Sequence, residues 1–142
     1  MAYRPDPGLD SSLGIFLYKH IVKDMQLVRI YRCLCDETRL RILNLLSHGP
    51  LCVCHFQVLL GVPQVKVSKH LNYLKKHGMV GVRKHQNWRI YELPRKGSKE
   101  LELHLKCLQD CVQEQPLFKA DLKRLRKIES RAREITKACG AC

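Results

Sequence analysis

The sequence predicts a mostly α-helical α+β fold in which a single β-hairpin follows a series of short helices. Apolar residues recur at the three- and four-residue intervals of amphipathic helices over most of the chain, but alternate with polar residues between about residues 80 and 93. Glycine and proline stand at the boundaries of these patterns. A chain of 142 residues is long enough for one core. We therefore predict one domain over residues 1–115 and a basic helical extension over residues 116–142.

The first two helices are expected on either side of an aspartate that is a good N-cap. Residues 1–12 contain two prolines and one glycine and are predicted to form a loose arm. The helix expected over residues 13–34 is apolar around most of its circumference, which indicates burial against a partner. Asp36 then caps a helix that ends before Gly49-Pro50.

Two more helices precede the hairpin. A short helix is predicted over residues 51–60, because Gly61 follows it. The next helix is predicted from about Gln64 to His77, with a proline before its first turn and a glycine just after its end.

Changes in the spacing of apolar residues along the chain predict the hairpin and the last helices. Strands are expected over residues 80–83 and 88–93, with the bend near Gln86-Asn87 and Trp88 packed at the base of the hairpin. Helical spacing returns over residues 101–112. Pro116 separates this helix from a last one, over about residues 117–138.

This order of elements is that of a winged helix-turn-helix, in which the second helix of the motif enters the DNA major groove. Val67, Leu71 and Leu74 share one stripe of that helix and should anchor it on the core. Its polar residues can meet base edges, and the basic hairpin can meet the backbone or the minor groove. The predicted DNA-binding residues are Gln64, Lys66, Ser68, Lys69, His70 and Asn72 on the helix, and Arg83, Lys84, Gln86, Asn87 and Arg89 on the hairpin.

The charge of the chain favours a polyanionic partner. The net charge is +13, and residues 33–94 carry nine Lys or Arg against three Asp or Glu. Residues 116–142 carry eight against three, and we expect this tail either to touch flanking DNA or to be a solvated helix. No apolar run is long enough to span a bilayer and no secretory signal begins the chain, so we expect a cytoplasmic protein without a membrane partner.

Eight cysteines are unusual for such a chain, and they fall into four close pairs. In a reducing compartment such pairs indicate a soft-ion site or a redox switch, so we expect thiols rather than a disulfide framework. The candidate thiolates are Cys52 and Cys54, with Cys33, Cys35, Cys107, Cys111, Cys139 and Cys142 as further candidates. For the first pair the alternative is that both are small buried hydrophobes, and for Cys107 and Cys111 it is packing within a helix.

The position of Cys52 and Cys54 suggests how an ion could act. If both lie in the first turn of the helix predicted over residues 51–60, their side chains point roughly 200° apart, and one ion cannot easily bind both. The amides of a first turn still lack partners, so distortion is cheaper there than in mid-helix. We therefore expect chelation to unwind this turn and to shift the groove-reading helix packed against it.

Two runs of residues carry a resemblance to a known family: Asp36-Glu37-Thr38-Arg39-Leu40 and Val67-Ser68-Lys69-His70-Leu71. The first matches the DETR signature and the second the recognition-helix pattern of the ArsR/SmtB family of metal-responsive repressors, which residues 33–94 resemble. Leu51-Cys52-Val53-Cys54-His55-Phe56 is similar to the ELCVCDL box of its arsenic, cadmium and lead sensors. Two departures stand out: His55 replaces an acidic residue, and Gln57 stands where the arsenic prototype has a third cysteine.

The resemblance implies a homodimer, paired through its first and last core helices, that binds double-stranded operator DNA and dissociates when an ion binds. The expected inducer is arsenite, with antimonite as a further candidate, and no organic cofactor is expected. Cadmium, lead or zinc, or oxidation of paired thiols, are alternative signals. The family's zinc site on the last core helix is judged absent, because no histidine follows Glu102-Leu103-His104. No nucleophile–base pattern or phosphate loop supports an enzyme, and a thiol enzyme or metalloid buffer without operator specificity is the remaining alternative.

Overall fold

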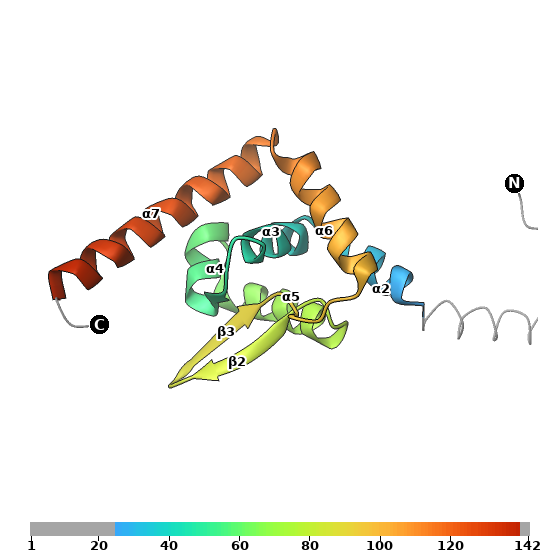
Figure 1. Ribbon diagram of the computed structural model, residues 1–142, viewed down its shortest axis with the longest axis horizontal. Coiled ribbons are helices and arrows are strands. Elements are labelled where there is room, and N and C mark those ends of the chain that lie inside the picture. The colour runs from blue at the N-terminus through green and yellow to red at the C-terminus, as the bar shows by residue number, and fades with distance from the viewer. Residues whose placement is uncertain (1–24, 140–142) are drawn as a thin grey trace, which may run out of the picture.

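The computed structural model describes the backbone of residues 25–139 and the side chains of residues 25–131. The described residues form six helices and a small antiparallel sheet. The hairpin of the sheet projects at one edge of the molecule, and the last and longest helix runs along one side (Figure 1). In chain order the elements are α2 (Gln26–Leu34), α3 (Glu37–Leu46), β1 (Leu51–Cys52), α4 (Val53–Leu60), α5 (Gln64–Lys76), β2 (Gly81–His85), β3 (Trp88–Glu92), α6 (Lys99–Val112) and α7 (Pro116–Cys139).

The helix boundaries follow the capping residues. The Asp36 side chain accepts a hydrogen bond from the Arg39 amide at 2.9 Å, which confirms Asp36 as the N-cap of α3. Gly61 ends α4 in the left-handed conformation, with φ of 65°, which a residue with a Cβ adopts only at a cost. Ser98 caps α6 by accepting from the Leu101 amide at 3.2 Å. The helix expected over residues 13–34 is not continuous, because Met25 is extended and α2 begins at Gln26; its earlier part lies outside the described residues.

The sheet has one strand more than the hairpin predicted. β2 and β3 pair as expected, with His85 opposite Trp88 and the bend at Gln86. Leu51–Cys52 then adds as β1 to the other edge of β3, opposite Tyr91 and Ile90. The prediction of one helix over residues 51–60 is therefore wrong at its start, because the two residues after Gly49-Pro50 pair with β3 instead of entering the helix.

The core lies between α3, α4, α5 and the sheet. Val67, Leu71 and Leu74 of α5 are fully buried, which confirms the predicted anchoring stripe. α4 contributes Phe56 and Leu59 to the same core and packs against α5. The groove-reading helix α5 therefore rests on α4, the helix whose start carries Cys52 and Cys54.

The long helix α7 is attached to α3 and α4 through a buried ion pair. Figure 1 shows α6 and α7 diverging from the turn at residues 113–115, with α3 between them. Arg41 of α3 donates from Nε and Nη2 to the two carboxylate oxygens of Asp121 at 2.7 and 2.8 Å, and Nη2 also donates to the Leu60 carbonyl at 3.2 Å. Phe118 and Leu125 bury the adjoining face of α7. Within the described part of the chain, no helix is long and apolar enough to cross a membrane.

Candidate DNA interface and thiol site

The groove-reading helix α5 presents a polar face to solvent. Gln64, Lys66, Lys69 and Asn72 are exposed, as expected for side chains that meet DNA. Ser68 and His70 are half-buried. His70 Nδ1 lies 3.5 Å from Asp36 Oδ1, so its ring is held toward α3 rather than directed freely outward.

One residue of this face was not anticipated. Val65, the second residue of α5, has 69% of its surface exposed. An apolar side chain at this position can contact the methyl group of thymine, which is one of the contacts by which proteins read the major groove. Its place at the start of the helix, opposite the anchoring stripe, is the signal that could have identified it.

The hairpin carries the other predicted DNA contacts. Lys84, Gln86, Asn87 and Arg89 are exposed around its tip, whereas Arg83 is paired with Glu92 at 3.3 Å. Trp88 is also at the tip, where it is 55% exposed and lies beside the turn. The expectation that Trp88 packs at the base of the hairpin is therefore wrong, because β3 begins at Trp88 and its buried residue is Tyr91.

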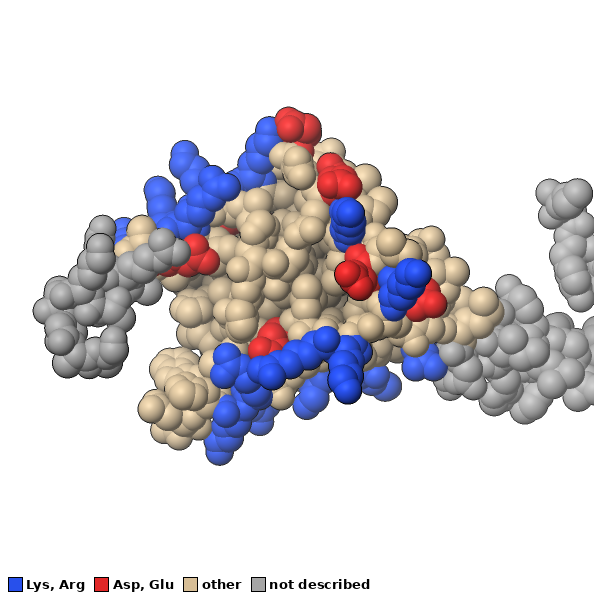
Figure 2. All heavy atoms as spheres, viewed as in Figure 1, with Lys and Arg blue, Asp and Glu red and all other residues tan. Residues whose placement is uncertain are grey.

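Lys and Arg gather over the hairpin and its neighbouring surface and again along α7, whereas α6 displays both signs of charge (Figure 2). The exposed cations of the first region are Lys66, Lys69, Lys75 and Lys76 on α5 and Arg83, Lys84 and Arg89 on the hairpin. Such a concentration of positive charge attracts the phosphate backbone.

The Asp-Glu-Thr-Arg segment fixes the position of α5. Arg39 donates from Nε to the Cys33 carbonyl at 2.8 Å and from Nη2 to the Arg32 carbonyl at 2.9 Å, which ties α3 to the end of α2. Its guanidinium carbon lies 4.5 Å from the centroid of the Tyr73 ring of α5. Together with the Asp36–His70 contact, these interactions connect three helices at the base of the groove-reading helix.

The first thiol pair lies where β1 becomes α4. Cys52 and Cys54 form a disulfide, with Cα atoms 5.5 Å apart. This differs from the expectation of reduced thiols. It also corrects the expectation that the two side chains point in opposite directions: Cys52 is not in the helix but is its extended N-cap, with φ of −88° and ψ of 165°, and its sulfur turns toward that of Cys54.

A histidine completes a cluster of potential ligands at this point. A ring nitrogen of His55 and the two sulfurs all lie within 4.8 Å of one another. Cys54 is exposed, so the cluster opens to solvent. Among the residues with described side chains, this is the one group of three metal-ligating residues that lie so close together. His55 is not among the ligands predicted from the sequence, although it directly follows the Cys-x-Cys of residues 52–54.

The other cysteines lie in different settings. Cys33 is fully buried in the core, and burial raises the pKa of its thiol from 9.0 to about 11, so it is poorly suited to bind an ion as a thiolate. Cys35 is exposed. Cys107 and Cys111 are exposed on α6 with sulfurs 4.0 Å apart, and the hydrogen bond between them raises the pKa of Cys111. The side chains of Cys139 and Cys142 lie outside the described residues.

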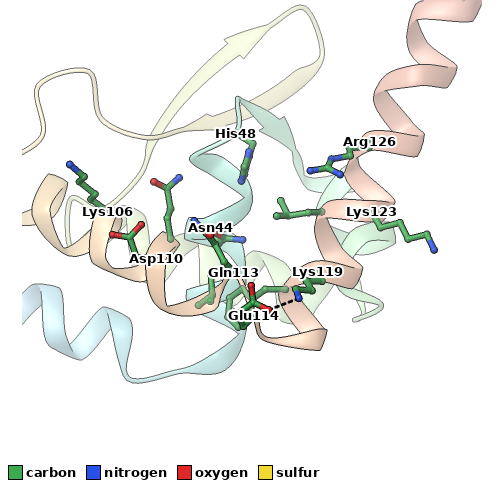
Figure 3. Close-up of a pocket in the computed structure, with 13 residues that line it drawn as sticks. Asn44, His48, Lys106, Asp110, Gln113, Glu114, Lys119, Lys123 and Arg126 are labelled. Carbon is green, nitrogen blue, oxygen red and sulfur yellow. Dashed lines mark hydrogen bonds and ion pairs between the residues drawn. The ribbon is translucent and has the colours of Figure 1, made fainter.

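A hollow of about 900 Å³ opens between α3, α6 and α7. Figure 3 shows Lys106 of α6 and Lys123 and Arg126 of α7 around it, with the 2.8 Å ion pair of Lys119 and Glu114 at one end. None of the thiols or α5 residues described above lines it. It therefore belongs to neither candidate site.

An exposed polar helix on a helix-turn-helix scaffold, beside a basic hairpin, defines a winged-helix DNA-binding regulator. A family model described as "Bacterial regulatory protein, arsR family" matches residues 36–82. The chain is 37% identical over 91 residues to the arsenical resistance operon repressor of Escherichia coli K12, covering 61% of this chain and 78% of that protein. It is 46% identical over 63 residues to an uncharacterized HTH-type transcriptional regulator of Methanocaldococcus jannaschii, covering 44% of this chain and 71% of that protein.

Among solved structures, HlyU from Vibrio cholerae N16961 matches with a TM-score of 0.56 at 28% identity, covering 61% of this chain and 90% of that chain. The chain belongs to the ArsR family of winged-helix transcriptional regulators. It is accordingly a DNA-binding regulator and not an enzyme.

Proposed function

We propose that this protein is a homodimeric repressor that leaves its operator when arsenite binds the thiols of Cys52 and Cys54. The observation that carries this proposal is the meeting of the two sulfurs at the junction of β1 and α4. Arsenical resistance repressors among its relatives support a metalloid as the signal. Thiolates are soft ligands and suit trivalent arsenic, and antimonite has the same preference.

The chemistry requires both cysteines as thiols, so a thiol reductant must first open the disulfide. Each sulfur then forms one bond to arsenic in place of a hydroxyl group, and each thiol proton leaves with that hydroxyl as water. Two such exchanges consume two thiols and release two waters. The third hydroxyl of arsenous acid can remain, so two sulfurs are sufficient.

The effect of ion binding at the thiol site can reach the DNA-binding surface by two structural routes. α4 packs against α5, so movement of the first turn of α4 changes the support of the groove-reading helix. Cys52 also pairs with Ile90 of β3, so the same movement reaches the hairpin. A coupling free energy of roughly 1–3 kcal/mol between the ion and DNA changes operator affinity by about 5- to 150-fold.

A homodimer is supported by apolar side chains of α2 and α6 that are exposed among the described residues. Leu27 and Tyr31 of α2 and Leu103 of α6 are exposed, and the Tyr31 hydroxyl lies 3.2 Å from His104 Nε2, which connects the two helices. Large exposed apolar groups that gather on adjoining helices are typical of an interface. Two α5 helices in one dimer would read two operator half-sites about one DNA turn apart.

The test is the release of operator DNA from the reduced protein. We expect arsenite to dissociate the wild-type complex and to leave the Cys52→Ser and Cys54→Ser complexes intact. The matched control is Cys107→Ser/Cys111→Ser, which removes another close thiol pair and should still respond. Titration with antimonite, cadmium, lead and zinc under the same reductant identifies the range of signals. Unaltered release from both Cys52→Ser and Cys54→Ser would refute the assignment.

The disulfide supports a second candidate function, in which the repressor responds to oxidation of the same two thiols. Forming it removes two electrons and two protons from the dithiol, and a peroxide could accept them. Release by peroxide without arsenite, reversed by a thiol reductant and abolished in Cys54→Ser, would support this candidate. Release by arsenite under strong reductant would support the first.

A further inference from the structure

We propose that His55 is the third ligand of the site, and that Cys52, Cys54 and His55 together bind a borderline divalent cation, zinc or cadmium. This inference rests on the proposed function and extends it. The repressor would then bind divalent cations through two sulfurs and an imidazole, and arsenite through the two sulfurs alone.

The ring of His55 has a buried polar atom without a partner among the described residues. Nδ1 of His55 is buried and makes no hydrogen bond with any described residue. A buried polar group without a partner costs about 1–3 kcal/mol, so native proteins rarely leave one unsatisfied. A cation bound by the imidazole would satisfy a ring nitrogen that nothing else in the described chain satisfies.

Other histidines of the described chain show the contrast. Both ring nitrogens of His104 have neighbours, the Glu100 carbonyl at 2.6 Å and the Tyr31 hydroxyl at 3.2 Å. His70 lies against Asp36. These rings are held by structural contacts, whereas a ring nitrogen of His55 has two sulfurs within 4.8 Å and Nδ1 has no hydrogen-bond partner among the described residues.

The three ligand atoms lie at a spacing that suits one cation. In tetrahedral zinc sites, Zn–S bonds of about 2.3 Å and Zn–N bonds of about 2.0 Å place neighbouring ligand atoms about 3.5–3.8 Å apart. The three atoms here lie within 4.8 Å of one another, so small side-chain movements bring them to that spacing once the disulfide is reduced. Loss of one proton from each thiol gives two thiolates, which balance the charge of the cation.

The ligands, two sulfurs and one imidazole, favour a borderline divalent cation. Imidazole with thiolate suits zinc and similar cations, whereas the softest ions prefer sulfur alone. Gln57, at the position where the arsenic prototype has a third cysteine, is exposed and offers only an amide. His55 is the residue that supplies a third strong ligand from the same helical turn.

The experiment compares two ions on the same variants, all reduced with a phosphine. His55→Asn removes the ligand and keeps a polar side chain of similar length. His48→Asn, at an exposed histidine outside the cluster, is the matched control. Cadmium affinity is measured by calorimetry, and operator release by fluorescence anisotropy with cadmium and with arsenite.

We expect His55→Asn to weaken cadmium binding by about 100-fold or more, beyond the roughly 10- to 100-fold typical of residues that only orient a ligand. Its release by arsenite should change by less than about twofold, because the two-sulfur site remains. His48→Asn should behave as the wild type with both ions, and Cys52→Ser should respond to neither. As a measurement that needs no variant, cadmium should shift the ring-nitrogen NMR signals of His55 in the wild-type protein.

Wild-type cadmium affinity in His55→Asn, or no cadmium binding by the reduced wild type, would overturn this inference while leaving arsenite release intact. If His55→Asn lost its response to arsenite as fully as its response to cadmium, the inference that arsenite needs only the two sulfurs and cadmium also needs the imidazole would be overturned. Continued release of Cys52→Ser and Cys54→Ser by arsenite would instead refute the proposed function itself. If His55→Asn does not fold, absence of a His55 NMR shift with cadmium still refutes the inference.

Discussion

Replacing Asp121 by alanine should strongly lower the free energy of unfolding, because the substitution leaves the Arg41 guanidinium buried without a counter-charge. The side chains of Arg41 and Asp121 are 7% and 1% exposed and share two hydrogen bonds of 2.7 and 2.8 Å. Removing one partner of a buried pair costs about 3–5 kcal/mol. The Leu60 carbonyl, 3.2 Å from Nη2, satisfies only part of what the guanidinium loses.

Urea unfolding followed by circular dichroism measures this cost. The double variant Arg41→Met/Asp121→Leu is the informative companion, because an apolar pair of similar volume needs no counter-charge and should recover most of the lost stability. Asp110→Ala, at an exposed acidic residue of α6, is the control for loss of one surface carboxylate and should stay within about 0.5 kcal/mol. A loss below about 1 kcal/mol for Asp121→Ala, or no recovery in the double variant, would refute this reasoning.

Three further predictions concern other parts of the molecule. Burial raises the pKa of the Cys33 thiol from 9.0 to about 11, so between these pH values the folded state keeps a proton that the unfolded chain loses. The free energy of unfolding should therefore be unaffected by this thiol below pH 9 and should fall by up to about 3 kcal/mol as the pH rises to 11. Urea unfolding should show this decrease in the wild type and not in Cys33→Ala. Lys69→Ala should lower the slope of log operator affinity against log salt by about one, and an unchanged slope would mean that this lysine meets no phosphate. Leu103→Asp should convert the proposed dimer to a monomer in sedimentation experiments, whereas Val58→Asp, at a comparably exposed valine of α4, should not. A Leu103→Asp variant that remains dimeric would exclude the α2–α6 surface as the dimer interface.

Local signals predicted most of the fold. The Asp36 cap, the glycine after α4 and the alternation around the hairpin each depend on neighbours in sequence, and each is present in the structure. The stripe of Val67, Leu71 and Leu74 also follows from helical spacing alone, since its burial requires only that one face meets the core.

The features that the sequence did not predict depend on pairing between distant residues. β1 exists because Leu51 and Cys52 meet Tyr91 and Ile90, almost 40 residues later, and two residues carry no period from which to predict a strand. That pairing holds Cys52 extended, which brings the sulfurs together and corrects their expected directions. His55 joins the cluster for the same reason, because its neighbours are set by the strand–helix junction.

The exposed Trp88 has a similar explanation. Its place in the sequence, at the start of an alternating strand, fits either face of the hairpin. The register that places it opposite His85, next to the turn, decides that it lies at the tip. The outward-facing positions of α5 were easier to predict, because the buried stripe of Val67, Leu71 and Leu74 determines which face of the helix meets solvent.

The central claim is that the thiol site and operator DNA act on each other through α4, and linkage makes this claim directly measurable. If arsenite lowers operator affinity by a given factor, operator DNA must lower arsenite affinity by the same factor. We therefore propose to measure the arsenite affinity of the reduced protein with and without saturating operator, beside the operator affinity with and without arsenite. We predict equal factors of about 5- to 150-fold, which are lost in Cys52→Ser. An arsenite affinity that operator DNA leaves unchanged would contradict the claim.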